Sequence, residues 1–180
     1  MYLRPMKDCD IPIIVRWLTD ETMLHKWCAN EFCEFPLTAE TMRAYYAARR
    51  ERDDYFEFCA FDESGLVGHF ILEFLDKAKT NLWLGFVILA PEQRGKGRGK
   101  ELVSLAVRYA FTLAGAKKMT LAVFRNNPAA LRVYETLGFR EVPAPEPPLT
   151  VMGSVWDAAF MELETPIRKE IQGFLLDNNL

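Results

Sequence analysis

The sequence has little of what binds metals or spans membranes. It contains two histidines, and its four cysteines form no C-x-x-C pair, so a metal site is not expected. The longest apolar run, Leu82–Ala90, has nine residues, whereas a membrane-spanning helix needs roughly 20. The stretch Met1–Pro5 lacks the apolar segment of a secretory signal. We therefore predict reduced thiols, a cytoplasmic location and no membrane partner.

The sequence also lacks a dominant sign of charge. Lys and Arg number 22 and Asp and Glu number 25, which gives a formal net charge of −3. This balance provides no global attraction to nucleic acid, which is not expected as a partner. Half of the 180 residues are hydrophobic and 13% are aromatic, which argues against disorder. A chain of this length suits one domain over residues 1–180.

Hydrophobic periodicity predicts a mixed α/β sheet. The turn Glu63–Gly65 joins two strands in a hairpin, and both faces of these strands are apolar, so helices should cover both faces of the sheet. Residues 21–36 suit a loop or broken helix that covers a site, and the proline-rich segment 143–148 suits either a stiff loop or a ligand for a partner domain. The expected strands are 1–4, 55–62, 66–75, 82–89, 119–124 and 155–163, and the expected helices are 8–18, from Thr38, 102–113, 128–137 and 165–176.

The segment Gln93–Lys100 is the most informative part of the chain. It lies between the buried strand 82–89 and the helix that follows, and it reads Gln-Arg-Gly-Lys-Gly-Arg-Gly-Lys. Glycines at alternate positions leave backbone amides open to a ligand at a helix N-terminus, where an anion is favoured. Four cationic side chains accompany them. The pattern indicates a phosphate site, although the spacing matches neither a Walker loop nor a dinucleotide-binding turn.

Two motifs resemble those of the GNAT N-acetyltransferase superfamily. Arg94-x-x-Gly97-x-Gly99 after an apolar strand resembles its acyl-CoA-binding motif, and the segment from Asn127 to Phe139 resembles its second signature. One helix and one strand separate the two motifs, as in the family. The resemblance implies an acyl-CoA N-acyltransferase fold with a mostly antiparallel sheet, splayed central strands and a cofactor-binding core over residues 82–139, followed by a C-terminal strand and helix at 155–176.

The resemblance also implies where acetyl-CoA, the co-substrate, should bind. Backbone groups of the bulged cofactor strand would bond to the pantetheine arm, and the amides of the glycine turn would hold the pyrophosphate. Tyr134 would point at the thioester sulfur and act as general acid, since a tyrosine with an ordinary pKa of about 10 stays protonated at pH 7. The cofactor-binding residues expected in this way are Val87, Ile88, Leu89, Arg94, Gly95, Lys96, Gly97, Arg98, Gly99, Lys100, Asn127 and Tyr134.

The sequence departs from the family where a general base is often found. The two family positions that carry a glutamate correspond here to Trp83 and Ala122. Glu73 is the tentative base, because its apolar neighbours could raise a carboxyl pKa, although an exposed or paired charge near a strand end is the simpler interpretation. His69 lies four residues earlier on the same strand. Glu31 and its neighbour Glu34, in the covering loop, could attract a cationic amine.

These observations predict an enzyme that transfers an acetyl group from acetyl-CoA to a primary amine by direct attack in a ternary complex. The amine could be a protein N-terminus or a small molecule. The alternative is a non-catalytic acyl-CoA sensor with a degraded site, which the residues at the two base positions favour and Tyr134 disfavours. We expect a monomer or a homodimer.

Overall fold

The computed structural model of the chain describes residues 1–145 and 147–164, which form a seven-stranded mixed sheet with helices on both faces. The strand order is β1-β2-β3-β4-β5-β9-β6, with a separate hairpin β7-β8. The strands are β1 (Tyr2–Pro5), β2 (Tyr55–Asp62), β3 (Gly65–Phe74), β4 (Asn81–Leu89), β5 (Lys118–Phe124), β6 (Arg140–Val142), β7 (Leu149–Val151), β8 (Ser154–Trp156) and β9 (Ala158–Glu164). The helices are α1 (Ile11–Val15), α2 (Glu21–Cys28), α3 (Ala39–Ala47), α4 (Arg98–Arg108) and α5 (Pro128–Thr136), with a 3-10 turn at Pro91–Gln93 and a π-helical turn at Tyr109–Leu113.

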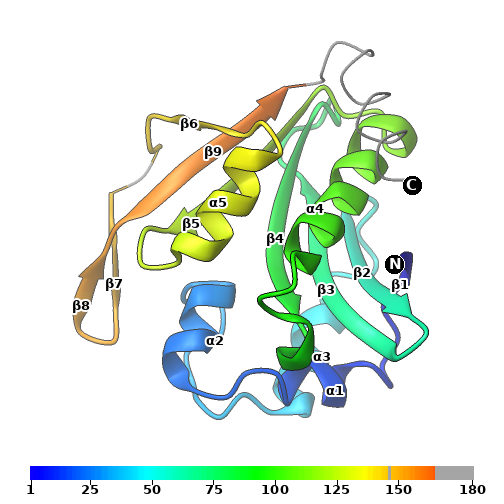
Figure 1. Ribbon diagram of the computed structural model, residues 1–180, viewed down its shortest axis with the longest axis vertical. Helices are drawn as coiled ribbons and strands as arrows, with labels where there is room; N and C mark the ends of the chain where they lie inside the picture. Colours follow the sequence, from blue (N-terminus) through cyan, green and yellow to red (C-terminus); the bar gives the residue numbers. More distant parts are fainter. Residues whose placement is uncertain (146, 165–180) are drawn as a thin grey trace.

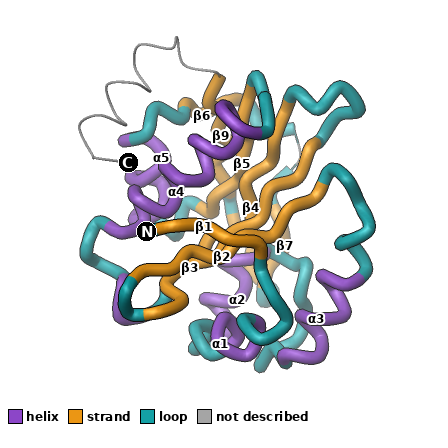
Figure 2. Tube along the Cα trace, turned by 90° about the vertical axis from the view of Figure 1, so that its right-hand side faces the viewer, coloured by secondary structure: helices purple, strands orange, loops and turns teal. Residues whose placement is uncertain are grey.

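Two hydrophobic cores lie on opposite faces of the sheet. On one face, α4 and α5 pack against the sheet through residues such as Leu102 and Tyr134. On the other face, α1, α2 and α3 pack through residues such as Ile14, Leu24 and Met42, all fully buried. Figures 1 and 2 show the two helix groups on either side of the sheet. The predicted mixed sheet, covered on both faces, is confirmed.

Helix α1 is shorter than the helix predicted over residues 8–18, for a reason that involves the tertiary structure. Asp10 stands at its N-cap position, but the carboxylate caps no helix amide. It accepts two hydrogen bonds from the Arg4 guanidinium, at 2.7 and 2.8 Å, and one from the Lys7 amide. These bonds hold the pKa of Asp10 below its usual range although burial opposes them.

Helices α2 and α3 begin at side-chain caps that the sequence contains. The Asp20 carboxylate accepts from the Met23 amide at 2.8 Å, and the Thr38 hydroxyl accepts from the Thr41 amide at 3.1 Å. The helix predicted from Thr38 is therefore confirmed. The stretch 21–36, expected as a loop or broken helix, forms α2 followed by a turn.

The end of the chain differs more from expectation. The single strand predicted over 155–163 is two strands, β8 and β9, which are interrupted at Asp157. The short strands β6 and β7 were not predicted, because three-residue strands carry too little periodicity to be recognised. The helix expected over 165–176 lies outside the described residues. Within those residues, no helix has the length and apolar character needed to cross a membrane.

Candidate active site

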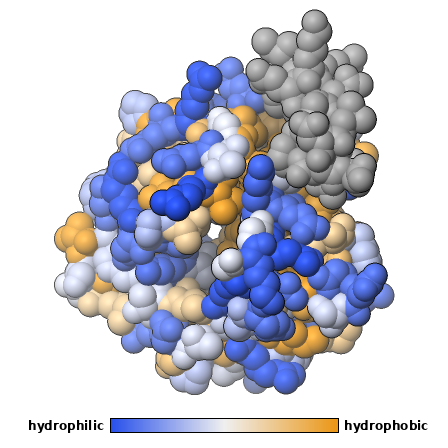
Figure 3. Space-filling model, viewed as in Figure 1, coloured by the Kyte–Doolittle hydropathy of each residue, from blue (hydrophilic) through white to orange (hydrophobic). Residues whose placement is uncertain are grey.

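The central strands β4 and β5 separate along their length. They pair in parallel only where Asn81–Trp83 lie beside Lys118–Thr120. Beyond this short contact, β5 pairs only with β9, and β4 pairs only with β3. Figure 1 shows the two strands diverging from their shared end, and the space-filling view in Figure 3 shows a gap through this face of the molecule. The splayed strands predicted from the sequence are confirmed.

Strand β4 also contains the predicted bulge. The pairing with β3 shifts register between Ile71, which faces Gly85, and His69, which faces Ile88. Within the bulge, Phe86 has a φ of 53°, in the left-handed region that a bulky side chain rarely adopts. A bulge leaves residues without ladder partners and bends the strand. The backbone of Val87 and its neighbours therefore lies at the edge of the opening, where pantetheine contacts were predicted.

The glycine turn leaves backbone amides accessible at the N-terminus of α4. Gly95 and Gly97 have φ angles of 72° and 75°, and Gly97 is the helix N-cap without any side-chain cap. A Cβ atom at either glycine would meet no atom within 4 Å. A Cβ atom added at Gly99, by contrast, would lie 3.5 Å from the Val133 side chain of α5, an ordinary van der Waals contact. The turn provides the geometry of an anion site.

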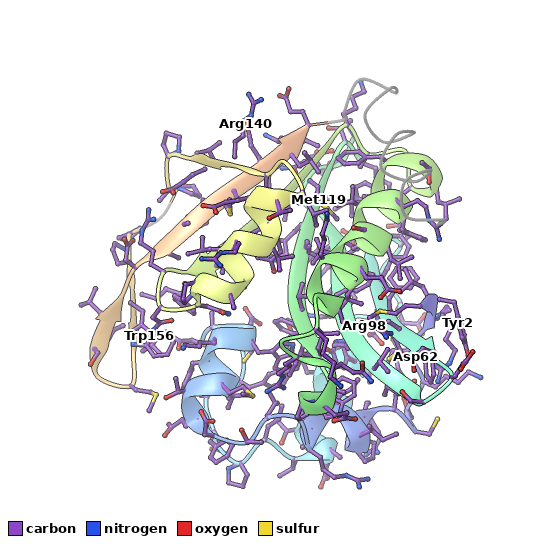
Figure 4. The ribbon with its side chains drawn as sticks, in the orientation of Figure 1. Tyr2, Asp62, Arg98, Met119, Arg140 and Trp156 are labelled. Atoms are coloured by element: carbon purple, nitrogen blue, oxygen red, sulfur yellow. The ribbon has the colours of Figure 1, made fainter. Side chains whose placement is uncertain are left out.

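The cationic side chains of this turn have different roles from one another. Arg94 points inward: its guanidinium donates to the Leu89 and Trp17 carbonyl oxygens, each at 3.1 Å, and burial lowers its pKa. Arg98 binds Asp62 of β2 and lies 3.0 Å from a carboxylate oxygen of Glu101 (Figure 4). The exposed Lys96 lies at the turn itself. The charge available to a phosphate is thus smaller than the sequence alone suggested.

Helix α5 places Asn127 and Tyr134 beside the opening. The Asn127 side chain accepts a bond from the Ala130 amide at 3.4 Å and so begins the helix, in addition to any contact with the cofactor. The Tyr134 side chain is buried and lies against the Phe139 ring. Burial raises the pKa of the Tyr134 phenol, and among the described residues its hydroxyl has no hydrogen-bond partner. A protonated hydroxyl without a competing partner can donate a proton.

A cavity of about 250 Å³ opens between the diverging strands on the side of α2 and α3. Residues Leu84–Phe86 of β4 and Ala122–Phe124 of β5 form two of its walls. Aromatic side chains contribute to its surface, as do Ala144, Pro147 and Pro148 of the proline-rich segment. The other lining residues are Lys26, Trp27, Cys28, Ala29, Glu31, Tyr45, Ile71, Glu73, Trp83, Ala144, Pro147, Pro148, Leu149, Asp157, Ala158 and Phe160.

Three carboxylates line this cavity, and each is paired with an arginine. Glu31 is 3.8 Å from Arg49 and accepts from the Tyr45 hydroxyl at 3.1 Å. Glu73 accepts from Arg52 at 2.5 Å, and Asp157 accepts from Arg125 at 2.7 Å. The three arginines do not belong to the described lining residues. Each carboxylate retains lone pairs beyond those that these partners occupy, since a carboxylate can accept about four hydrogen bonds.

Both positions at which the family can carry a base line this cavity, as Trp83 and Ala122. Glu73 is the direct cross-strand neighbour of Trp83, so the two side chains share one face of the sheet. The structure thus brings the tentative base to the cavity, whereas Tyr134 is not among its lining residues.

His69 does not reach the cavity. It is fully buried, its Nδ1–H donates to the Phe58 carbonyl at 2.9 Å, and its Nε2 accepts from the Tyr46 hydroxyl at 2.8 Å. Burial lowers the pKa of His69 to about 4, so the ring stays neutral as a core residue. The interpretation of His69 as a candidate base is therefore not supported.

Comparison with known proteins agrees with this architecture. The Acetyltransferase (GNAT) family matches residues 20–139. The chain belongs to the acetyltransferase (GNAT) family. It is 28% identical over 138 residues to the SPbeta prophage-derived uncharacterized N-acetyltransferase YokL of Bacillus subtilis (76% of this chain, 74% of that protein). It is 26% identical over 139 residues to a spermidine N(1)-acetyltransferase of Vibrio cholerae (77% and 78%).

The fold matches solved members of the same family. The crystal structure of spermidine N-acetyltransferase from Vibrio cholerae in complex with CoA and spermine has a TM-score of 0.74 at 24% identity, covering 91% of this chain and 94% of that one. The GNAT chain described here is an acetyl-CoA-dependent N-acetyltransferase, and acetyl-CoA is its co-substrate. The family membership thus favours the enzyme over the sensor alternative.

Proposed function

We propose that this GNAT chain acetylates a primary amine of a small polycation of the spermidine type, by direct attack within a ternary complex. The sequence left a protein N-terminus and a small-molecule amine open. Two features support the second: relatives named spermidine N(1)-acetyltransferases align along about three quarters of this chain, and the acceptor cavity is lined by three carboxylates. The second feature carries the proposal.

The cavity suits an elongated cation with more than one charge. Glu31, Glu73 and Asp157 come from the turn after α2, from β3 and from the residue before β9, and Lys26 is the single cationic lining residue among those described. Aromatic walls between the carboxylates suit the methylene segments of a polyamine, and an aromatic face also attracts ammonium groups. Each carboxylate already has an arginine partner, and an ammonium group of the acceptor would add a second partner to it.

In the proposed chemistry, one residue donates a proton to the leaving thiolate and another accepts a proton from the attacking amine. The amine nitrogen attacks the thioester carbonyl carbon, and the carbon–sulfur bond breaks as the tetrahedral intermediate collapses. Tyr134, whose phenol stays protonated because burial raises its pKa, would give its proton to the departing thiolate. Glu73 would take the proton that the amine loses. A backbone amide of β4 near Val87 would stabilise the oxyanion.

A solved relative from Vibrio cholerae is dodecameric. The sequence alone led us to expect a monomer or homodimer. The relative favours a larger homo-oligomer for this chain, and we propose one.

The proposal is tested by acetyl-CoA-dependent thiol release with a panel of amines. Spermidine and spermine should give a kcat/KM at least about tenfold above that of butylamine or of peptides with a free α-amine, because the additional ammonium groups meet the additional carboxylates. Faster turnover of an N-terminal peptide than of every polyamine would overturn the assignment of the acceptor.

Two variants test whether a carboxylate of the cavity causes the preference for polyamines. Glu31→Gln removes a cavity charge and should raise the KM for spermidine several-fold while the KM for acetyl-CoA stays unchanged. Glu34→Gln, in the same turn but exposed and outside the described cavity lining, is the matched control and should change neither. Equal effects of the two substitutions would show that only the general surface charge matters.

A further inference from the structure

The bulge in β4 is a strained feature that needs an external cause. Phe86 and Val87 together oppose a single residue of β3, and Phe86 holds a φ of 53°. A left-handed conformation at a bulky residue is unfavourable and persists only where the surroundings impose it. A relaxed β4 would continue its regular pairing with β3, and its backbone polar groups would then not be available at the opening.

The Trp27 side chain, at the end of α2, holds the strained residue by its carbonyl group. The indole Nε1–H donates to the Phe86 carbonyl oxygen at 2.6 Å, and both residues are buried. This oxygen lies inside the bulge, where no strand ladder supplies a donor. A buried carbonyl without a donor is costly, so the indole favours the bulged conformation over alternatives that would turn the oxygen elsewhere.

The same side chain also fixes the Phe86 ring. The Trp27 and Phe86 ring centroids are 4.9 Å apart, and Phe32 stacks on Trp27 at 5.9 Å with an interplanar angle of 9°. The Tyr45 ring completes the cluster at 5.6 Å from Phe86. Both the carbonyl and the ring of the strained residue thus contact side chains of α2, α3 and the turn between them.

We propose that Trp27 is a positioning residue for acetyl-CoA. Its indole N–H holds the Phe86 carbonyl, and this bond keeps the following backbone, Val87–Leu89, presented to the pantetheine arm. Because Trp27 also lines the acceptor cavity, it joins the acceptor side of the molecule to the cofactor strand. The inference depends on the use of acetyl-CoA and is independent of which amine is the acceptor.

Calorimetric titration with CoA, in the absence of any acceptor, tests the proposal. Trp27→Phe keeps an aromatic ring but removes the N–H donor, and it should weaken CoA binding about tenfold, which corresponds to about 1.4 kcal/mol. Trp17→Phe is the matched control, since Trp17 is buried in the same core and its indole nitrogen makes no hydrogen bond among the described residues. It should lose similar thermal stability and retain CoA affinity within twofold.

Nuclear magnetic resonance of the unaltered protein gives a readout that does not depend on any variant folding. The chain contains four tryptophans and therefore gives four indole N–H signals. The Trp27 signal, assigned through its contact with the Phe86 ring, should exchange slowly with solvent and shift on CoA addition more than that of Trp17. An unshifted Trp27 signal, or equal CoA affinities of Trp27→Phe and Trp17→Phe, would show that Trp27 is only a packing residue.

Discussion

The two sides of the site are built in different ways. The cofactor side consists of backbone from two short segments, the bulged end of β4 with the glycine turn and the start of α5. The acceptor side consists of side chains from α2, α3, β3, β4, β5, the proline-rich loop and β9. A backbone site can be specified by a few adjacent residues, whereas a side-chain site depends on the whole tertiary arrangement. The GNAT fold thus fixes the cofactor locally and leaves the acceptor to distant positions.

The difference extends to electrostatics. On the predicted cofactor side, partial charges of backbone amides at the start of α4 would meet the phosphates, and Arg94 and Arg98 are already bonded within the protein. On the acceptor side, the lining includes the full charges of Glu31, Glu73 and Asp157, whereas the arginines paired with them are not among the described lining residues. Substitutions on the two sides should therefore separate cleanly between co-substrate and acceptor parameters.

The largest expected effect comes from Tyr134, the predicted general acid on α5. Tyr134→Phe should lower kcat between about 10²- and 10⁴-fold, the usual contribution of a general acid, because the thiolate then leaves without a proton. The CoA affinity should stay unchanged, because the ring and its packing on Phe139 are retained. Steady-state kinetics and calorimetry measure the two quantities on the same preparations.

Tyr109→Phe is the control for this substitution. Tyr109 packs on Phe58 with ring centroids 4.5 Å apart, and burial raises the pKa of its phenol as well, but it lies at the far end of α4. It should retain full turnover. If Tyr134→Phe were equally active, another group or water would supply the proton.

The next effect tests the backbone character of the cofactor side. Gly97→Val should weaken CoA binding by more than about tenfold, because a β-branched residue at a φ of 75° costs about 1–2 kcal/mol or more and displaces the amides of the turn. Calorimetric titration with CoA measures this loss.

The chain provides a closely matched control for Gly97. Gly115 has a φ of 72°, also meets no atom within 4 Å of an added Cβ, and lies beyond the π-helical turn. Gly115→Val should therefore lower the melting temperature by a similar amount and leave CoA affinity unchanged. If CoA affinity fell equally in both variants, the turn would matter only for stability.

The difference between the cofactor side and the acceptor side also explains which features could be predicted from the sequence. The splayed strands, the bulge and the glycine turn followed from short motifs, and each is found where it was expected. The inward direction of Arg94 was missed, because its partners are backbone carbonyls of Leu89 and of the distant Trp17. Carbonyl groups have no signature in a sequence.

On the acceptor side, the sequence predicted residues but not their assembly. Glu31 and Glu73 were recognised as candidates, whereas Tyr45, Trp27 and Asp157 were not assigned to the site. Asp157 could have been noticed as one of two charges, with Glu162, within the apolar segment predicted as strand 155–163. Nothing local to Trp27 indicates that its indole meets Phe86, because that contact joins positions 59 residues apart.

The smallest expected effect concerns the tentative general base, Glu73. It tests whether this carboxylate, beside Trp83, can replace the glutamates that the family can carry at the positions of Trp83 and Ala122. Glu73→Gln keeps an oxygen for the Arg52 hydrogen bond and removes the ability to take a proton. It should lower kcat at pH 7 about tenfold, a moderate loss because solvent can also accept the proton. Steady-state turnover with saturating spermidine measures the change.

The pH dependence of that loss separates a base from a binding charge. A primary amine with a pKa near 10.4 arrives protonated at pH 7, and its neutral fraction rises roughly tenfold per pH unit as the pH approaches 10, so the need for a base declines. The loss of kcat in Glu73→Gln should therefore shrink as the pH rises. The control is Glu162→Gln on β9, which removes a carboxylate paired with Lys118 of β5 and should lower kcat at no pH. A Glu73→Gln deficit of constant size from pH 7 to 10 would assign Glu73 to attracting the acceptor, and the proton would then leave through solvent.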